Sequence, residues 1–271
     1  MPAMNIELTS VEKTLFVPLL GKASDYNEKS SILADKKANE IIGSIDYDFN
    51  PMKENGIGNS MACLRAKIID NLTREFIIPD KENVVLHLGC GLDSRYNRMG
   101  IENIYWYDID FKEVIDIRKK YFRETKYYHL IASSILEKDW LKMIPKGKDN
   151  YVVIAEGVFQ YIEAEKIKEL IRTLRENIGE YYLLFDAMGK MAIKKLKNDK
   201  FIKETGIEVH FAADDENELL SWDSGIKFIK KRYFVFNGIK GGTIVIKALC
   251  KIINFMPAVK KLYKILAYRI G

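Results

Sequence analysis

Apolar residues in the first 80 positions of the chain recur at the spacing of a helix. In residues 33–45, and again in residues 61–77, they are three or four positions apart, so that they fall on one face of a helix. The segment between these stretches is rich in asparagine, proline and glycine, which is typical of a loop. The pattern predicts an N-terminal helical cap over residues 1–80.

From residue 83 onward, short apolar runs alternate with helical stretches. This alternation is typical of βα units built around a parallel sheet. The runs predict strands at 84–88, 104–108, 127–132, 151–155 and 181–185, and the clearest stretches between them predict helices at 111–122 and 164–177.

The last part of the chain predicts three further features. Residues 187–224 are more polar and are expected to form a helical lid or substrate wall. Residues 230–236 and 243–248 are rich in β-formers and flank a glycine turn, which predicts a late antiparallel hairpin. After Pro257, apolar residues recur at helical intervals among basic side chains, so residues 251–271 are expected to form a basic amphipathic helix.

Composition narrows the class of protein. Of 271 residues, 48% are hydrophobic, which is enough to bury a core, and the formal net charge of +5 is too small to demand a nucleic-acid partner. Three scattered cysteines and three scattered histidines suggest neither a disulfide framework nor a metal site. The sequence has no signal-peptide pattern and no apolar run of 18 residues, so we expect a cytoplasmic protein. A basic helix over 251–271 could lie on an anionic membrane, but base rates favour docking on the core.

The segment after the first predicted strand is the most informative one. In VVLHLGCGLDSRYNRM, Gly89 and Gly91 directly follow the strand, where the chain must turn sharply and its backbone must approach a ligand. The second strand ends in WYDID, so Asp108 or Asp110 lies where an acid accepts hydrogen bonds from a ribose. Both point to the same side of the strand, so spacing does not choose between them. Alternatively, one of them caps the helix that follows.

The third position of the glycine pattern separates two classes of cofactor. A dinucleotide-binding enzyme normally has a glycine there, so that the helix can pack close to a pyrophosphate. Ser94 occupies this position, which argues for a ligand without pyrophosphate. S-adenosylmethionine is the usual ligand of that kind, and an NAD(P)-dependent oxidoreductase on the same sheet is the alternative.

The strings HLGCGLDSRYNRM, WYDIDF and VVIAEGVFQYI resemble motifs of the leucine carboxyl methyltransferase family, in the same order. The chain is most similar to the bacterial branch of O-methyltransferases related to the tetracenomycin polyketide enzyme, and the likeness covers about residues 12–245. The resemblance implies a class I methyltransferase-like, doubly wound α/β fold with a mostly parallel sheet and a late antiparallel hairpin. In this scheme residues 81–250 form the core that binds S-adenosylmethionine, and S-adenosylhomocysteine is the product.

The resemblance also implies a cofactor site. Glycines would pass beside the methionine and ribose parts, the strand-end acid would bind the ribose hydroxyls, and an arginine would grip the cofactor's carboxylate. After the third strand the family has an aspartate near the adenine amino group, where this chain has a serine, which accepts that hydrogen bond more weakly. The implied residues are Lys22, Arg65, Gly89, Gly91, Asp110, Ser134, Ile135 and Glu156.

The motifs contain no side chain that is an obvious general base, and this bears on the chemical class of the methyl acceptor. A carboxylate is ionised at neutral pH and needs no base, whereas an alcohol or phenol must lose its proton. No histidine lies in a motif, which favours a carboxylate of a small molecule, a polyketide or a peptide C-terminus over a hydroxyl acceptor.

Three residues are expected at the reacting centre. Gln160 and Tyr161 follow the Glu156 turn and should line the methyl-transfer site. Arg95 is a candidate partner for the acceptor's charge, although it could instead hold its own loop through Asp93. The other candidate cations are Arg98, Lys190 and Lys194.

Overall fold

The computed structural model describes residues 4–5, 10–49, 56–198, 202–203, 206–233, 243–255 and 262–271. The strands are β1 (Met4–Asn5), β2 (Ile45–Asp46), β3 (Asn83–Leu88), β4 (Tyr105–Asp110), β5 (Tyr128–Ala132), β6 (Asn150–Ala155), β7 (Tyr181–Met188), β8 (Ile226–Tyr233) and β9 (Tyr263–Ile270). The helices are α1 (Ser10–Tyr26), α2 (Lys36–Gly43), α3 (Gly56–Phe76), α4 (Arg95–Met99), α5 (Lys112–Tyr121), α6 (Ala164–Ile178), α7 (Lys190–Lys197), α9 (Asn217–Leu220) and α10 (Ile244–Phe255), with short 3₁₀ turns η2 (Asp139–Met143) and η3 (Phe159–Tyr161).

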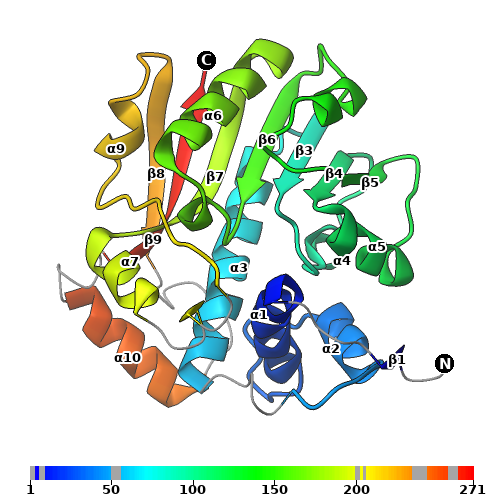
Figure 1. Ribbon diagram of the computed structural model, residues 1–271, viewed down its shortest axis with the longest axis vertical. Coiled ribbons are helices and arrows are strands. Elements are labelled where there is room, and N and C mark those ends of the chain that lie inside the picture. The colour runs from blue at the N-terminus through cyan, green and yellow to red at the C-terminus, as the bar shows by residue number, and fades with distance from the viewer. Residues whose placement is uncertain are drawn as a thin grey trace.

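Within these residues, seven strands form one sheet in the order β5-β4-β3-β6-β7-β9-β8 (Figure 1). The strands from β5 to β7 pair in parallel, and β9 pairs antiparallel with both β7 and β8. The expected class I methyltransferase-like fold is therefore confirmed, as a doubly wound, mostly parallel sheet that ends in antiparallel strands.

Two apolar cores hold the layers together. Every residue of β3 and β6 is buried, as expected for the central strands of a parallel sheet that is covered on both faces. One core joins one face of the sheet to α1, α2, α3 and α5, and the other joins the opposite face to α6 and α9. The site lies where the N-terminal helices meet the carboxyl ends of the strands.

Most predicted elements are confirmed. The five strands predicted between residues 84 and 185 correspond to β3 to β7, and the two predicted helices correspond to α5 and α6. In the N-terminal region the predicted helices correspond to α2 and α3, and α1 adds a third one. The segment 187–224 includes α7 and α9, so it is helical in part.

Two predictions near the end of the chain are wrong. Residues 244–248, predicted as a strand, begin the helix α10. Residues 263–270, predicted as part of a basic amphipathic helix, form the strand β9, so the antiparallel pair is β8 with β9. The predicted glycine turn at 238–242, together with Pro257, lies outside the described residues.

The physical reason is that β9 is enclosed on both faces. It pairs with β7 from Tyr181↔Ile270 to Met188↔Tyr263, and its residues 264–268 are all buried. A strand covered on both faces shows no alternation of polar and apolar residues, so its spacing does not distinguish it from a helix. Lys264, which looked like a solvent-facing charge, is only 2% exposed, and its Nζ donates to the carbonyl oxygens of Ala213 at 2.6 Å and Asp214 at 3.0 Å.

None of the helices within the described ranges has both the length and the apolar character needed to span a bilayer.

Lys264 provides a test of the β9 strand. Lys264→Met removes the two donated bonds from buried carbonyl oxygens, so we expect the free energy of unfolding to fall by about 1–3 kcal/mol. Lys227→Met, at an exposed position of β8, is the matched control and should change it by less than about 0.5 kcal/mol. Urea unfolding followed by circular dichroism measures both, and equal effects would contradict the buried position of Lys264.

Candidate active site

The loop after β3 has a conformation that only glycines adopt easily. Gly89 and Gly91 have φ angles of +60° and +52°. A Cβ on Gly89 would lie 2.5 Å from Cγ2 of Val158, and one on Gly91 would lie 3.3 Å from Cδ2 of Leu15. A hydrogen bond connects the loop to β4, because the Gly89 N–H donates to the Ile109 carbonyl at 2.8 Å. Both predicted glycines are therefore required by the shape of this turn.

The two acids at the end of β4 have different environments. Asp108 is 1% exposed and accepts hydrogen bonds from Arg118, Tyr128 and Nε1 of Trp106. Its carboxylate oxygens are therefore bonded to buried side chains. Asp110 accepts the backbone N–H groups of Gly91 at 2.7 Å and Phe111 at 2.8 Å, and burial raises its pKa. Of the two candidates that spacing left open, Asp110 is the one in direct contact with the glycine loop.

A cavity of about 630 Å³ opens beside this loop. Of the residues expected at the site, those that line it are Lys22, Arg65, Gly89, Gly91, Glu156, Gln160 and Tyr161. Four expected residues, Arg95, Asp110, Ser134 and Ile135, are not among the described residues that line it.

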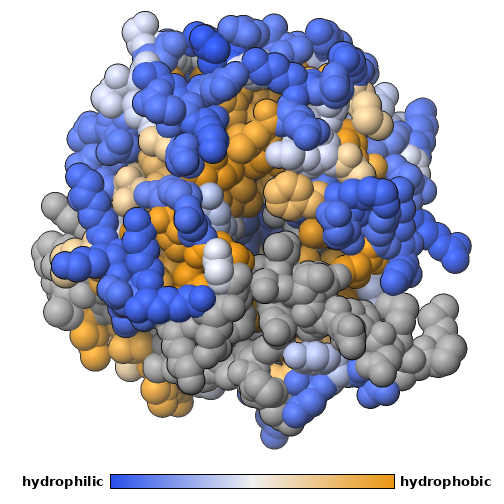
Figure 2. Space-filling model, viewed as in Figure 1, coloured by the Kyte–Doolittle hydropathy of each residue, from blue (hydrophilic) through white to orange (hydrophobic). Residues whose placement is uncertain are grey.

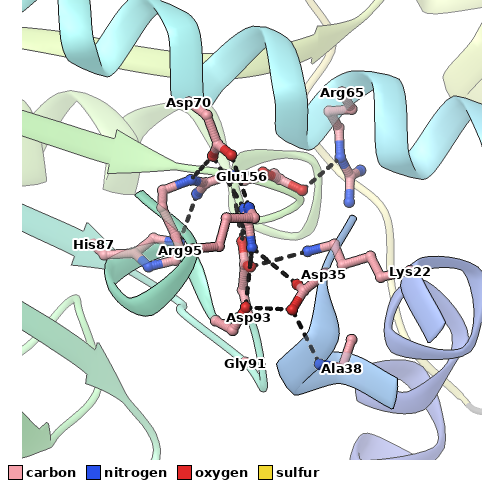
Figure 3. A network of polar contacts seen from close by, with 12 residues as sticks. Lys22, Asp35, Ala38, Arg65, Asp70, His87, Gly91, Asp93, Arg95 and Glu156 are labelled. Atoms are coloured by element: carbon pink, nitrogen blue, oxygen red, sulfur yellow. Dashed lines mark hydrogen bonds and ion pairs between the residues drawn. The ribbon is translucent and has the colours of Figure 1, made fainter. Parts of the chain in front are cut away.

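Arg65 extends from α3 into the cavity and is held on one side (Figure 3). Its Nε donates to Glu156 at 3.0 Å, and its Nη1 contacts Asp186 at 3.3 Å and donates to the hydroxyl of Tyr263, which would accept, at 2.6 Å. Among the described residues, Nη2 has no hydrogen-bond partner. Arg65 therefore presents one free edge of a guanidinium whose orientation is already fixed.

Glu156 directly follows β6 and is the acid at the centre of the network. Burial alone would raise its pKa, but the positive charges of Arg95, Arg65 and Lys22 outweigh burial and lower the pKa to about 2. Glu156 is thus a permanent carboxylate at neutral pH. Lys22, from α1, is 3% exposed and contacts Asp93 at 3.2 Å, so it reaches the same network from the N-terminal cap.

Arg95 has no exposed surface, and each of its guanidinium nitrogens has a partner. Nε donates to Asp70 at 2.7 Å, and Nη2 contacts both Asp93, at 3.3 Å, and Glu156. Nη1 lies 3.0 Å from Nε2 of His87. This geometry favours the alternative role for Arg95, in which it holds the loop and its acids rather than an acceptor.

The other candidate cations are ion-paired with buried acids or are not among the described residues that line the cavity. Arg98 contacts Asp70 and Asp93 at 2.7 Å and 2.6 Å. Lys190 and Lys194 are exposed on α7 and are not among the described residues that line the cavity.

The remaining expected residues lie at the two ends of the site. Gln160 and Tyr161 are the last two residues of η3, and the Gln160 carbonyl accepts the N–H of His210 at 2.8 Å. Ser134 and Ile135 follow β5, next to β4, where the N–H of Ser133 donates to the Asp110 carbonyl at 2.9 Å. The contact of Ser134 and Ile135 with an adenine therefore stays a prediction.

Sequence reasoning missed three residues of the site. Asp186, near the end of β7, accepts the Gly157 N–H at 2.6 Å and a bond from Tyr263, and His87 lines the cavity from β3. An acid near the end of a predicted strand was a usable signal for Asp186. Tyr263 had no such signal, because its segment was predicted to be a helix.

Comparison with known proteins shows the family. The model described as leucine carboxyl methyltransferase matches residues 24–175, more than half of the chain. The chain is 30% identical over 82% of its length to the tetracenomycin polyketide synthesis O-methyltransferase TcmP of Streptomyces glaucescens, of which the match covers 83%. It is 25% identical over 86% of its length to the S-adenosyl-L-methionine-dependent methyltransferase dpfgK of Gibberella zeae, of which 85% is covered.

Solved structures share the fold at low sequence identity. Magnesium protoporphyrin IX methyltransferase of Synechocystis PCC 6803, crystallised with bound SAH, superimposes with a TM-score of 0.50 at 12% identity, covering 88% of this chain and 94% of that one. A duf574 family protein of Streptomyces avermitilis gives a TM-score of 0.53 at 9% identity, covering 91% and 100%. The oxidoreductase alternative finds no support among these relatives. The chain belongs to the leucine carboxyl methyltransferase family, and it is an S-adenosylmethionine-dependent methyltransferase.

Proposed function

We propose that the protein transfers the methyl group to a carboxylate of an apolar small molecule. The observation that carries this proposal is that the described acids, phenols and histidine that line the cavity are ion-paired, protonated or hydrogen-bonded at both ring nitrogens, so that none of them is placed to take a proton from an acceptor. A hydroxyl acceptor requires such a base, whereas a carboxylate does not.

His87 is the one histidine among the described residues that line the cavity, and both of its ring nitrogens are engaged. Nε2 faces the Arg95 guanidinium, which can only donate, so Nε2 accepts and the proton resides on Nδ1, 3.1 Å from Asp108. A histidine held in this tautomer between two buried partners has no lone pair left for an acceptor's proton.

The acids and phenols of the cavity are equally unsuited to base catalysis. The pKa of Glu156 is about 2, and although burial opposes it, the charges of Arg98, Lys22 and Arg95 hold the pKa of Asp93 well below its usual range. Burial raises the pKa of both Tyr161 and Tyr263, so these phenols stay protonated. These states leave an acceptor that is already anionic as the fitting substrate.

The wall of the cavity away from the charged network supports an apolar acceptor. It combines apolar side chains from α1, α3, the end of β7, α7 and the segment that follows α7, namely Leu15, Val17, Pro18, Leu19, Met61, Ala62, Met188, Leu196 and Ile202. Removing apolar surface from water is the main favourable term in such a site. Three of these residues belong to the segment 187–224, which we propose as the substrate wall.

The charged half of the site fits S-adenosylmethionine. The free Nη2 edge of Arg65 suits the carboxylate of the methionine part, and Glu156 suits its amino group. Asp110, already in contact with the glycine loop, suits the ribose hydroxyls, and Ser134 with Ile135 suits the adenine. Gly89 and Gly91 both line the cavity, so the backbone of their loop would lie directly beside the cofactor.

In this mechanism the protein acts by positioning the acceptor and the cofactor. When bound, the cofactor would supply a methyl group on a positively charged sulfur, and its transfer would form a bond from the carboxylate oxygen to the methyl carbon as the carbon–sulfur bond breaks, with S-adenosylhomocysteine as the leaving group. Gln160 and Tyr161 flank the acceptor side of the cavity and would orient the incoming carboxylate, and the apolar wall would exclude water. Arg95 acts indirectly, because it holds Asp93 and Glu156 in place.

The acceptor chemistry has a direct test. Incubation with methyl-labelled cofactor and a panel of apolar aliphatic and aromatic acids, matched with the corresponding alcohols and phenols, should give labelled products only from the acids. These products should be methyl esters, which alkali cleaves. An alkali-stable methyl ether as the main product would overturn the proposal of a carboxylate acceptor.

Asp110 tests the cofactor site. Asp110→Asn keeps the size of the side chain but removes its charge, so we expect affinity for S-adenosylmethionine to fall about 10- to 100-fold, the worth of hydrogen bonds to a charged group. Isothermal titration calorimetry measures the affinity. Asp116→Asn, at an exposed position of α5, is the control and should bind as the unaltered protein does. Unchanged binding by the Asp110 variant would exclude this acid from the ribose site.

Tyr263 tests whether the orientation of Arg65 matters. Tyr263→Phe removes the hydroxyl that bonds to both Arg65 and Asp186. Glu156 and Asp186 still contact Arg65, so only part of its orientation is lost, and we expect KM for S-adenosylmethionine to rise about three- to tenfold. The KM for the acceptor should change less. Tyr182→Phe on β7, which stacks on Phe76 at 4.5 Å, keeps its ring contact and is the control. A rise confined to the acceptor KM would assign Tyr263 to the acceptor instead.

A further inference from the structure

The helices α7 and α10 carry exposed apolar side chains that the methyltransferase chemistry does not explain. Nine large apolar side chains are exposed in the described part of the chain, and four of them lie on these two helices. Met191 is 75% exposed on α7, while Ile244, Val245 and Ile252 are 85%, 70% and 58% exposed on α10. Single exposed apolar residues are ordinary, but this concentration is not.

The same helices carry only positive charge. α7 contains four lysines and α10 contains two, and neither contains an acid. Within the parts of the chain that the structure describes, none of these six lysines has an ion-pair partner. Exposed lysines elsewhere often do, as in the pairs Lys112–Asp116 and Lys142–Asp139.

Positive charge is also concentrated at the end of the whole sequence. After Asp223 the sequence contains eleven lysines and arginines and no acid, so every acidic residue precedes residue 224. Several of these late basic residues are neutralised within the fold, for example Lys230 by Glu75 and Lys231 by Glu216. Lys247 and Lys251, on α10, are exposed.

The topology brings both helices to the edge of the sheet that holds the cavity. α7 follows the carboxyl end of β7. β8 runs in the direction of β7, because both are antiparallel to β9, so the connection that contains α10 also leaves from this edge. In Figure 1 the two helices lie at the lower left of the molecule, and Figure 2 shows apolar surface at the position of α10.

We propose that α7 and α10 form a docking surface for an anionic lipid membrane. Apolar side chains that enter the headgroup region and lysines that meet anionic lipid are the two contributions that hold a helix in a bilayer interface. An acidic protein surface would satisfy the lysines, but it would gain little from the exposed Ile244, Val245 and Ile252. A membrane satisfies both features at once.

This placement has a consequence for the acceptor, which rests on the proposed function. Leu196 of α7 lines the cavity, while the lysines of the same helix face solvent. Docking would bring the apolar wall of the cavity close to the lipid, so that an amphiphilic acid could enter from the bilayer.

Vesicle flotation tests the docking without any acceptor or cofactor, so its failure is distinct from failure of the carboxylate proposal. The full chain should bind vesicles that contain phosphatidylglycerol, bind pure phosphatidylcholine vesicles much more weakly, and lose binding as salt is raised. Lys247→Gln with Lys251→Gln should weaken binding roughly 30-fold, from about fivefold for each lysine. The matched control is Lys119→Gln with Lys120→Gln on α5, which should leave it unchanged.

The apolar contribution has its own pair of variants. Ile244→Gln with Ile252→Gln should reduce binding to phosphatidylglycerol vesicles, whereas Met143→Gln, also at an exposed position, should not. Thermal unfolding and S-adenosylmethionine affinity should be unchanged in all variants, because these side chains lie outside the cavity. No binding to anionic vesicles at low salt, or equal loss with the α5 control, would overturn the proposal. So would variants that change only self-association in sedimentation experiments, since the surface would then contact a second copy of the chain.

Discussion

A buried set of opposite charges holds the N-terminal helices against the carboxyl ends of the strands, and the site depends on it. The residues that take part are Lys22 of α1, Arg65 and Asp70 of α3, Arg95 of α4 and Glu156, which follows β6 (Figure 3). Burying such charges costs free energy that only their mutual contacts offset, and removing one partner from a buried pair typically costs about 3–5 kcal/mol. The cavity therefore keeps its shape because the network tolerates few alternative arrangements.

The network also decides which chemistry the site can perform. It lowers the pKa of Glu156 and Asp93, and it fixes His87 in one tautomer between Arg95 and Asp108. Each of these effects removes a potential base. A site that holds its charges this firmly fits the proposed transfer, in which the protein orients an acceptor that is already ionised and moves no proton.

The charged half of the cavity and its apolar wall come from different parts of the fold. The charges lie at strand ends and on the helices that pack against them, and the apolar wall comes largely from α1 and from the segment after β7. Beyond that segment, α7 and α10 carry lysines and exposed apolar side chains at the same edge of the sheet. The apolar acid proposed as acceptor and the lipid surface proposed as docking partner would both use this edge of the sheet, where apolar and basic side chains lie together.

Local patterns in the sequence determined the central fold and the family motifs. β3 to β7 and their helices were predictable because each has its own periodicity and its own turn residues. The glycines at 89 and 91 were predictable because the conformation of a turn is a local property, and the family resemblance named Arg65, Asp110 and Glu156.

Only the tertiary structure decided which partner each charged group takes. Spacing could not separate Asp108 from Asp110, because the difference lies in Arg118 and Tyr128, which reach Asp108 from other elements. Arg95 could not be assigned from the sequence, since its partners Asp70 and Glu156 lie 25 and 61 positions away. Residues 263–270 read as a helix because β9 sends apolar side chains into the cores on both faces of the sheet, and this burial is a property of the assembled sheet rather than of the segment.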